Sequence, residues 1–103
     1  MIDYKAAPIL KSLAAAAPDG IDVYFDNVGG AVLDAALANL AMHARIVLCG
    51  LISEYNSPDK VGARNLWQVL VKRATVKGFL IADYVPRFGE GAAQMATWAA
   101  AGK

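Results

Sequence analysis

The sequence is poor in the residues that build disulfides, metal centres and charged binding surfaces. Its single cysteine excludes an internal disulfide and suits a reducing cytoplasm, and its single histidine has no companion at metal-ligand spacing. Ten basic and nine acidic residues leave a net charge of +1, which gives no electrostatic reason to expect nucleic acid or an anionic membrane as a partner. We therefore expect a cytoplasmic protein without a metal site.

Long apolar runs and a signal peptide are also missing. No uninterrupted apolar stretch approaches the roughly 18 residues of a membrane-spanning helix, and Met1 is followed at once by Asp3 and Lys5. Yet 57% of the 103 residues are hydrophobic and the mean hydropathy is +0.38. A single small domain this apolar is expected to hide one face in another domain or a partner.

The centre of the chain predicts a strand, a helix and a second strand. Residues 21–26 alternate apolar with polar side chains, residues 32–40 place apolar side chains on one helical face, and residues 45–49 form a short apolar run. Together they make a βαβ unit, whose ligands bind outside the carboxyl ends of the strands. We therefore look for a site at residues 26–30 and 49–53.

The rest of the chain predicts further alternation. Residues 65–73 favour a helix, although their β-branched residues leave a strand open, and we expect Trp67, Met95, Trp98 and Ala99 to face the core. Gly102 is a plausible helix stop. The other expected elements are a helix over 6–17 that begins near Ala6 or Ala7, a loop over 53–62, a third strand over 75–81, a connection over 83–89 and a helix over 90–101.

The α-β-α-β-α-β-α order is that of the second half of a Rossmann-type doubly wound parallel sheet, here with about three to four strands and flanking helices. No G-x-G-x-x-G or A-x-x-G-x-x-G follows a predicted strand, so the usual pyrophosphate cradle is missing. We interpret the chain as a truncated domain, whose exposed first strand invites self-association through its edge.

Two motifs carry a specific resemblance. FDNVGG at residues 25–30 and RIVLCGLISEYN at residues 45–56 resemble the zinc-independent medium-chain dehydrogenase/reductase superfamily, and within it the prostaglandin reductase and alkenal/one double-bond reductase group. The likeness runs from IDYK near the start to WAAAGK at the end. It implies that residues 1–103 are a partial NADP-binding domain that lacks the family's N-terminal GroES-like catalytic domain and Gly-rich loop.

The resemblance also implies an activity for the parent enzyme. Such reductases pass a hydride from NADPH to the β-carbon of an α,β-unsaturated ketone or aldehyde without zinc, and the same superfamily contains quinone reductases. They commonly form homodimers by joining their cofactor-domain sheets, here near residues 75–81. A half-Rossmann module whose only activity is association therefore stays open as an alternative, as does a piece of a quinone reductase.

Site residues follow from the resemblance position by position. The family Asn at Asn27 contacts the cofactor, the family Tyr at Tyr4 helps hold the 2′-phosphate of NADP, and the family Tyr at Tyr55 has been put forward as a proton donor or orienting group. The loop along the nicotinamide comprises Cys49, Gly50, Leu51, Ile52, Ser53 and Tyr55. The strand-end residues against the nicotinamide are Phe79, Leu80 and Ile81.

Each assignment has an ordinary structural alternative. Asn27 could be a turn residue that bonds its own backbone, Gly29 and Gly30 a plain tight turn, and Tyr55 an exposed loop aromatic. Cys49 reads as a small buried residue rather than a nucleophile, because no basic neighbour or helix N-terminus argues for a lowered thiol pKa.

The single histidine and the two aspartates of the first predicted strand give no sign of chemistry in the sequence. His43 reads as a surface or turn residue. Asp22 and Asp26 share one strand face by period two, and Asp26 reads as a turn or strand-end residue, with no sign of an acid–base pair. Phe79–Ile81 can be core strand and still contact a cofactor through their backbone.

Overall fold

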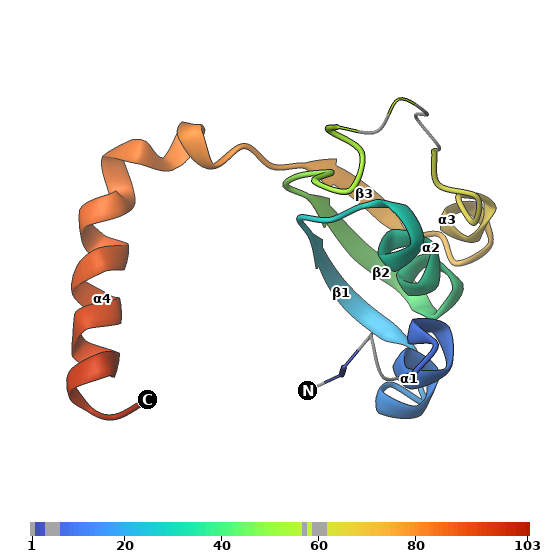
Figure 1. Cartoon of the computed structure of the whole chain (residues 1–103), viewed down its shortest axis with the longest axis horizontal. Helices are drawn as coiled ribbons and strands as arrows, with labels where there is room; N and C mark the ends of the chain where they lie inside the picture. The colour runs from blue at the N-terminus through green and yellow to red at the C-terminus, as the bar shows by residue number, and fades with distance from the viewer. Residues whose placement is uncertain (1, 4–6, 57, 59–61) are drawn as a thin grey trace.

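The computed structural model describes residues 2–3, 7–56, 58 and 62–103, and the candidate Tyr4 lies outside these ranges. Three parallel strands form one sheet in the order β1-β2-β3 (Figure 1). The elements are α1 (Ile9–Ala16), β1 (Ile21–Asp26), α2 (Gly30–Ala38), β2 (Leu40–Leu48), α3 (Trp67–Val71), β3 (Thr75–Gly78), the 3-10 helix η1 (Ile81–Arg87) and α4 (Phe88–Ala100). The predicted half of a doubly wound parallel sheet is confirmed.

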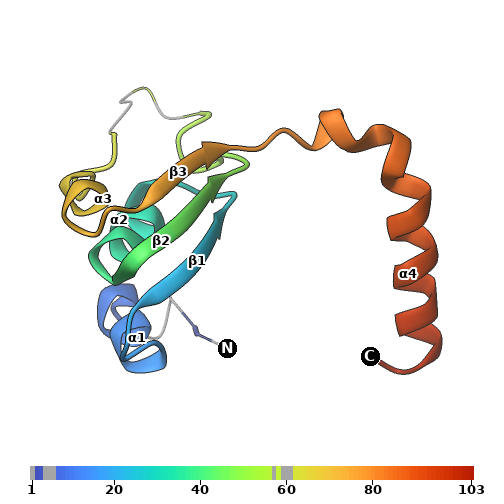
Figure 2. The same cartoon turned by 180° about the vertical axis from the view of Figure 1, so that it is seen from behind.

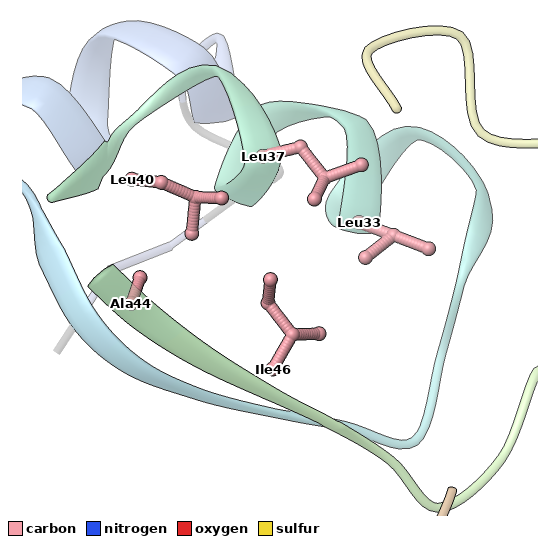
Figure 3. Close-up of a cluster of buried hydrophobic side chains, with 5 residues drawn as sticks. All are labelled: Leu33, Leu37, Leu40, Ala44 and Ile46. Carbon is pink, nitrogen blue, oxygen red and sulfur yellow. The ribbon is translucent and has the colours of Figure 1, made fainter. Parts of the chain in front are cut away.

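The core lies between α2 and β2. Its buried side chains point toward one another from the helix and the strand (Figure 3). Residues every three to four positions along α2 supply one side, as the helical periodicity predicted. The first residue of β2, together with two residues of its middle that share one face of the strand, supplies the other side. The cluster consists of Leu33, Leu37, Leu40, Ala44 and Ile46.

Only one face of the sheet is covered by helices within the described part of the chain. Tyr24 of β1 pairs with Ile46 of β2 on the helix side, where both are shielded. On the opposite face Val23 and Phe25 of β1 are exposed. The apolar alternation in β1 therefore marks the open face, whereas its half-buried face carries Tyr24 and the buried Asp26.

α4 stands away from the sheet in both views and contacts η1 (Figures 1 and 2). The expected core positions on the helices are wrong: Trp67, Met95, Trp98 and Ala99 are all exposed, Met95 to 62% and Trp98 to 49%. For the three residues of α4 the reason is that the chain leaves the sheet after β3, so the apolar face of α4 packs against no described strand. The radius of gyration, 15.9 Å, accordingly exceeds the value of about 13 Å for a compact chain of this length.

Several element boundaries differ from those expected. α1 begins only at Ile9, directly after Pro8, whose carbonyl accepts the first N–H bonds of the helix. β2 begins at Leu40 and not at Arg45, because an irregularity around His43, at φ 61°, lets Ile21 pair with Leu40 and Val23 with Arg45.

The elements of the C-terminal half also differ from their predicted boundaries. α3 is a helix, but of only five residues, and β3 ends at Gly78, three residues before the expected Ile81. The helix stop at Gly102 is confirmed, since its N–H and that of Lys103 donate to the carbonyls of Ala99 and Trp98. Among the described residues, no helix is long and apolar enough to cross a bilayer.

Candidate functional site

The loops that leave β1 and β2 lie side by side at the carboxyl edge of the sheet, where a βαβ unit binds its ligands. Three consecutive carbonyl groups of the first loop accept hydrogen bonds from the second, so the two loops form one unit. The Asp26 carbonyl accepts from the N–H groups of Cys49 (2.8 Å) and Gly50 (3.1 Å), that of Asn27 from Ile52 (3.2 Å), and that of Val28 from the N–H (3.0 Å) and Oγ (2.6 Å) of Ser53.

The side chain of Asp26 organises the first loop from inside. It is 1% exposed and is the buried charged residue of the described chain. Its Oδ1 accepts hydrogen bonds from the Tyr24 hydroxyl at 2.9 Å, the Val28 N–H at 3.0 Å and the Gly29 N–H at 3.1 Å. The carboxylate also lies just before α2, where the helix dipole favours a negative charge.

Because Asp26 satisfies the turn amides, Asn27 is not needed for the turn. The Asn27 side chain is exposed, and it makes no hydrogen bond to any part of the chain that the structure describes. The alternative in which Asn27 bonds its own backbone is therefore wrong. A free amide, with two donors and one acceptor oxygen, lies at the mouth of the two loops.

Two glycines allow the loops to approach each other. Gly29 has φ +72°, and a Cβ there would lie 2.8 Å from Cδ2 of Leu51. A Cβ at Gly50 would lie 3.1 Å from the Tyr55 hydroxyl oxygen and 3.2 Å from the Asn27 carbonyl oxygen. The glycines thus have a packing role, which the sequence had left open for Gly29.

Tyr55 folds back over its own loop. Its hydroxyl oxygen accepts a hydrogen bond from the Leu51 N–H at 3.1 Å, while 61% of the residue stays exposed. A phenol that accepts one hydrogen bond still has its own proton to donate. The arrangement therefore combines a fixed ring position with a free donor next to the Asn27 loop.

Tyr24 is the titratable group whose chemistry the fold changes most. Burial raises the pKa of its hydroxyl well above the ordinary value near 10, and the hydrogen bond to the Asp26 carboxylate and its negative charge raise this pKa further. Tyr24 thus stays protonated and keeps donating to Asp26 throughout the physiological range.

The third strand brings Phe79 to the same edge. Its N–H donates to the Leu48 carbonyl at 2.9 Å, its ring meets Phe25 edge-on at 5.6 Å, and it stacks on Tyr84 at 5.0 Å. The following Leu80 and Ile81 are exposed. A hollow of about 360 Å³ beside Phe79 is lined by Val47, Lys77, Gly78, Phe79, Leu80, Asp83 and Tyr84.

The other candidates have smaller roles. Cys49 has a free, partly buried thiol, and its backbone N–H does the bonding in the loop. His43 is exposed and lies in the irregular first half of β2, as a surface residue should. Within the described ranges, no three His, Cys, Asp or Glu residues are grouped to hold a metal.

Sequence reasoning undervalued two aspartates. Asp26 looked like a simple turn residue, although an acidic residue followed by the amides of a Gly-Gly turn is the pattern of a side chain that bonds those amides. Asp34 of α2 accepts from the N–H groups of Arg64 (2.7 Å) and Asn65 (3.1 Å) and so fixes the approach to α3. The two residues of the shorter contact are 30 positions apart in the sequence, and no local pattern predicts it.

Comparison with known proteins fits this architecture. The family described as zinc-binding dehydrogenase matches residues 1–98. The chain belongs to this family. The zinc-independent medium-chain dehydrogenase/reductase relationship that the two motifs predicted is thereby confirmed, because the relatives within the superfamily are the reductases that the motifs resemble.

Two relatives and one solved structure show the level of similarity. The chain is 51% identical over 65% of its length to the NADP(+)-dependent 2-alkenal reductase of Nicotiana tabacum, and 42% identical over 94% to the NADPH-dependent curcumin reductase of Escherichia coli. It is 45% identical to CurA from Vibrio vulnificus in a crystal structure with NADPH, with 98% of the chain covered and a TM-score of 0.73.

The likeness covers only part of each relative. The chain corresponds to 20% of the tobacco protein, 30% of the Escherichia coli protein and 32% of the Vibrio chain. This member of the family therefore spans about a third or less of the proteins that it resembles.

Proposed function

We propose that this chain supplies the nicotinamide half of an NADPH site in an enzyme that reduces the C=C bond of α,β-unsaturated ketones and aldehydes. The names of the tobacco and Escherichia coli relatives and the NADPH-bound Vibrio structure support the cofactor and the reaction. The observation that carries the proposal is the pair of hydrogen-bonded loops at the carboxyl edge of the sheet, one of which carries the free Asn27 amide and the other the Tyr55 hydroxyl.

The donor set fits a nucleotide cofactor. The carboxyl edge offers the unpartnered amide of Asn27, the hydroxyl proton of Tyr55 and the hollow beside Phe79. These are polar groups beside a hollow whose lining combines apolar side chains such as Phe79 and Leu80 with charged ones, and such a mixed surface suits a ring-and-ribose ligand. The proposed contact set is Asn27, Cys49, Gly50, Leu51, Ile52, Ser53, Tyr55, Phe79, Leu80 and Ile81, with Tyr4 added by family position.

NADPH, when bound, supplies the hydride for the β-carbon of the substrate. The chain's own residues would orient the cofactor and stabilise the negative charge that develops on the substrate. The Asn27 amide would hydrogen-bond the cofactor, and the loop 49–53 would supply further contacts to it. The Tyr55 hydroxyl, whose oxygen is held by the Leu51 N–H, donates its proton toward the enolate oxygen or carbon as negative charge develops there.

A calorimetric titration of the chain with NADPH, with NADH as the comparison ligand, tests the proposal. We expect micromolar binding that prefers NADPH. Asn27→Ala should weaken it by about 1 kcal/mol, roughly fivefold, because one hydrogen bond is lost. Asn39→Ala is the matched control, since Asn39 bonds the Ala35 carbonyl at the opposite end of the sheet. Binding that is absent, or equal in Asn27→Ala and the unmodified chain, would contradict the proposal.

The open edge of β3 supports a second candidate, association between copies. β3 pairs with β2 along one side, all four of its residues are exposed, and the described chain adds no strand to its other side. An unpaired edge is a template for another chain. Sedimentation velocity tests this candidate, and a strictly monomeric chain at high concentration would refute it.

A further inference from the structure

We propose that Asp26, held by Tyr24, is the positioning residue of the site: it sets the turn that presents Asn27 and, through that turn, the loop that carries Tyr55. The expected effect of Asp26 on cofactor binding rests on the proposed function, because Asn27 and Tyr55 matter for binding only if they face a cofactor. The structural part of the proposal rests only on contacts within the chain.

The first step is the burial of the carboxylate. Asp26 is 1% exposed yet fully partnered, with three donors on Oδ1 and a further contact of 3.2 Å from the Gly29 N–H to Oδ2. A buried charge is tolerated only when hydrogen bonds replace its water. If the turn amides moved away from Asp26, the buried carboxylate would lose the hydrogen bonds that replace its water. This cost holds the turn in its observed geometry.

The second step concerns the partners of the amide and carbonyl groups of the turn. The amide side of residues 28–29 is bound by the Asp26 carboxylate, and the carbonyl side of residues 26–28 is bound by the second loop. Both sides of the backbone are thus in use. The Asn27 side chain is exposed and has no hydrogen-bond partner in the described chain, so its amide is left for a ligand.

The third step links the turn to Tyr55. The second loop receives its position from the carbonyls of residues 26–28, and its Leu51 N–H in turn holds the Tyr55 hydroxyl. A change at Asp26 is therefore transmitted to Tyr55 through two sets of hydrogen bonds. Tyr24 completes the arrangement, since among the described residues its hydroxyl is the one side-chain donor on the carboxylate, and it comes from β1 itself.

The test uses Tyr24→Phe, which removes one hydroxyl, and Asp26→Asn, which keeps the shape but places an amide N–H against the Gly29 N–H. Asp22→Asn is the control, because Asp22 is exposed on the same strand and makes no hydrogen bond within the described residues. The deciding readout is amide hydrogen exchange by NMR at Ile52 and Ser53, with Ile46 and Val47 of β2 as internal references.

We expect exchange at Ile52 and Ser53 to accelerate roughly five- to tenfold in Tyr24→Phe and more in Asp26→Asn, with the β2 references unchanged. NADPH should bind more weakly by a similar factor, while Asp22→Asn behaves like the unmodified chain. If Asp26→Asn does not fold, Tyr24→Phe decides alone.

Unchanged exchange at Ile52 and Ser53 in Tyr24→Phe would overturn the positioning role whether or not NADPH binds. Faster exchange with unchanged NADPH affinity would overturn its link to the cofactor site. Absence of NADPH binding by the unmodified chain would refute the proposed function, and the exchange data would still decide the positioning of the two loops.

Discussion

The hydroxyl oxygen of Tyr55 accepts a hydrogen bond from the Leu51 N–H, 3.1 Å away, and so closes a small ring within the loop after β2. This bond connects two residues that the family resemblance assigns to the nicotinamide side of the site. It also explains how an exposed aromatic side chain can hold one position without being buried.

Tyr55→Phe removes the acceptor but keeps the ring. Because the bond is exposed, water can replace the lost oxygen, and we expect the free energy of unfolding to fall by less than about 1 kcal/mol. Urea denaturation measures this value. A loss well above that range would show that the phenol is a structural clamp and not a group left free for a ligand.

Gly50→Ala should displace the same ring. The new Cβ would lie 3.1 Å from the Tyr55 hydroxyl and 3.2 Å from the Asn27 carbonyl, so both groups must shift by a few tenths of an ångström. We expect the Leu51–Tyr55 bond to lengthen and weaken and the affinity for NADPH to decrease. Tyrosine NMR shifts and a ligand titration check the two effects.

Gly89→Ala is the control for this substitution. A Cβ at Gly89, within α4, meets nothing within 4 Å. Helix propensity then favours alanine by up to about 1 kcal/mol. If Gly50→Ala and Gly89→Ala left the Tyr55 resonances equally unchanged, the close packing at Gly50 would be refuted.

The sequence predicted the order of elements, and it predicted that the candidate residues would meet at the carboxyl edge of the sheet. It succeeded because residues 21–26 and 45–49 carry short-range patterns that a parallel sheet requires, and because FDNVGG and RIVLCGLISEYN are specific motifs. Asn27, the loop 49–53, Tyr55 and Phe79 do meet at one edge. Their proposed cofactor contacts remain predictions.

Burial was predicted less well, for a reason that is visible in β1. Alternation shows which side chains share a face but not which face a helix covers. Val23 and Phe25 lie on the uncovered face, and Trp98 lies on a helix that leaves the sheet. Asp26 was undervalued because its role depends on three donors that converge only after the turn has formed.

Tyr24 should give the protein a distinctive alkaline behaviour. Its pKa is raised by burial and by the Asp26 carboxylate above the value near 10 that it has in the unfolded chain. The folded state therefore binds the proton more tightly, so its stabilising effect is complete below about pH 10 and is lost as the pH rises above that value.

The ultraviolet absorbance of tyrosinate measures this titration. We expect one tyrosine to titrate only as the chain unfolds in alkali, and Tyr24→Phe to remove that late step together with the steep alkaline loss of stability. A full-amplitude tyrosine titration centred near pH 10 with the fold intact would contradict the raised pKa of Tyr24.

The last prediction separates the core from α4. Leu37 is 2% exposed within the α2–β2 cluster, so Leu37→Ala should destabilise the chain by about 2–5 kcal/mol through lost burial and a residual cavity. Trp98 is a much larger side chain, yet it is half exposed on α4. Trp98→Ala should therefore change the free energy of unfolding by no more than about 0.5 kcal/mol.

Urea denaturation of both variants at low protein concentration decides this contrast, because size alone would rank the tryptophan first and burial ranks the leucine first. An equal or larger loss in Trp98→Ala would mean that something covers α4 in solution. Repeating the measurement at higher protein concentration then shows what packs on α4. If stability rises with concentration in the unmodified chain but not in Trp98→Ala, a second copy of the chain packs there. Stability independent of concentration would instead require α4 to fold back onto its own open sheet face at Val23 and Phe25.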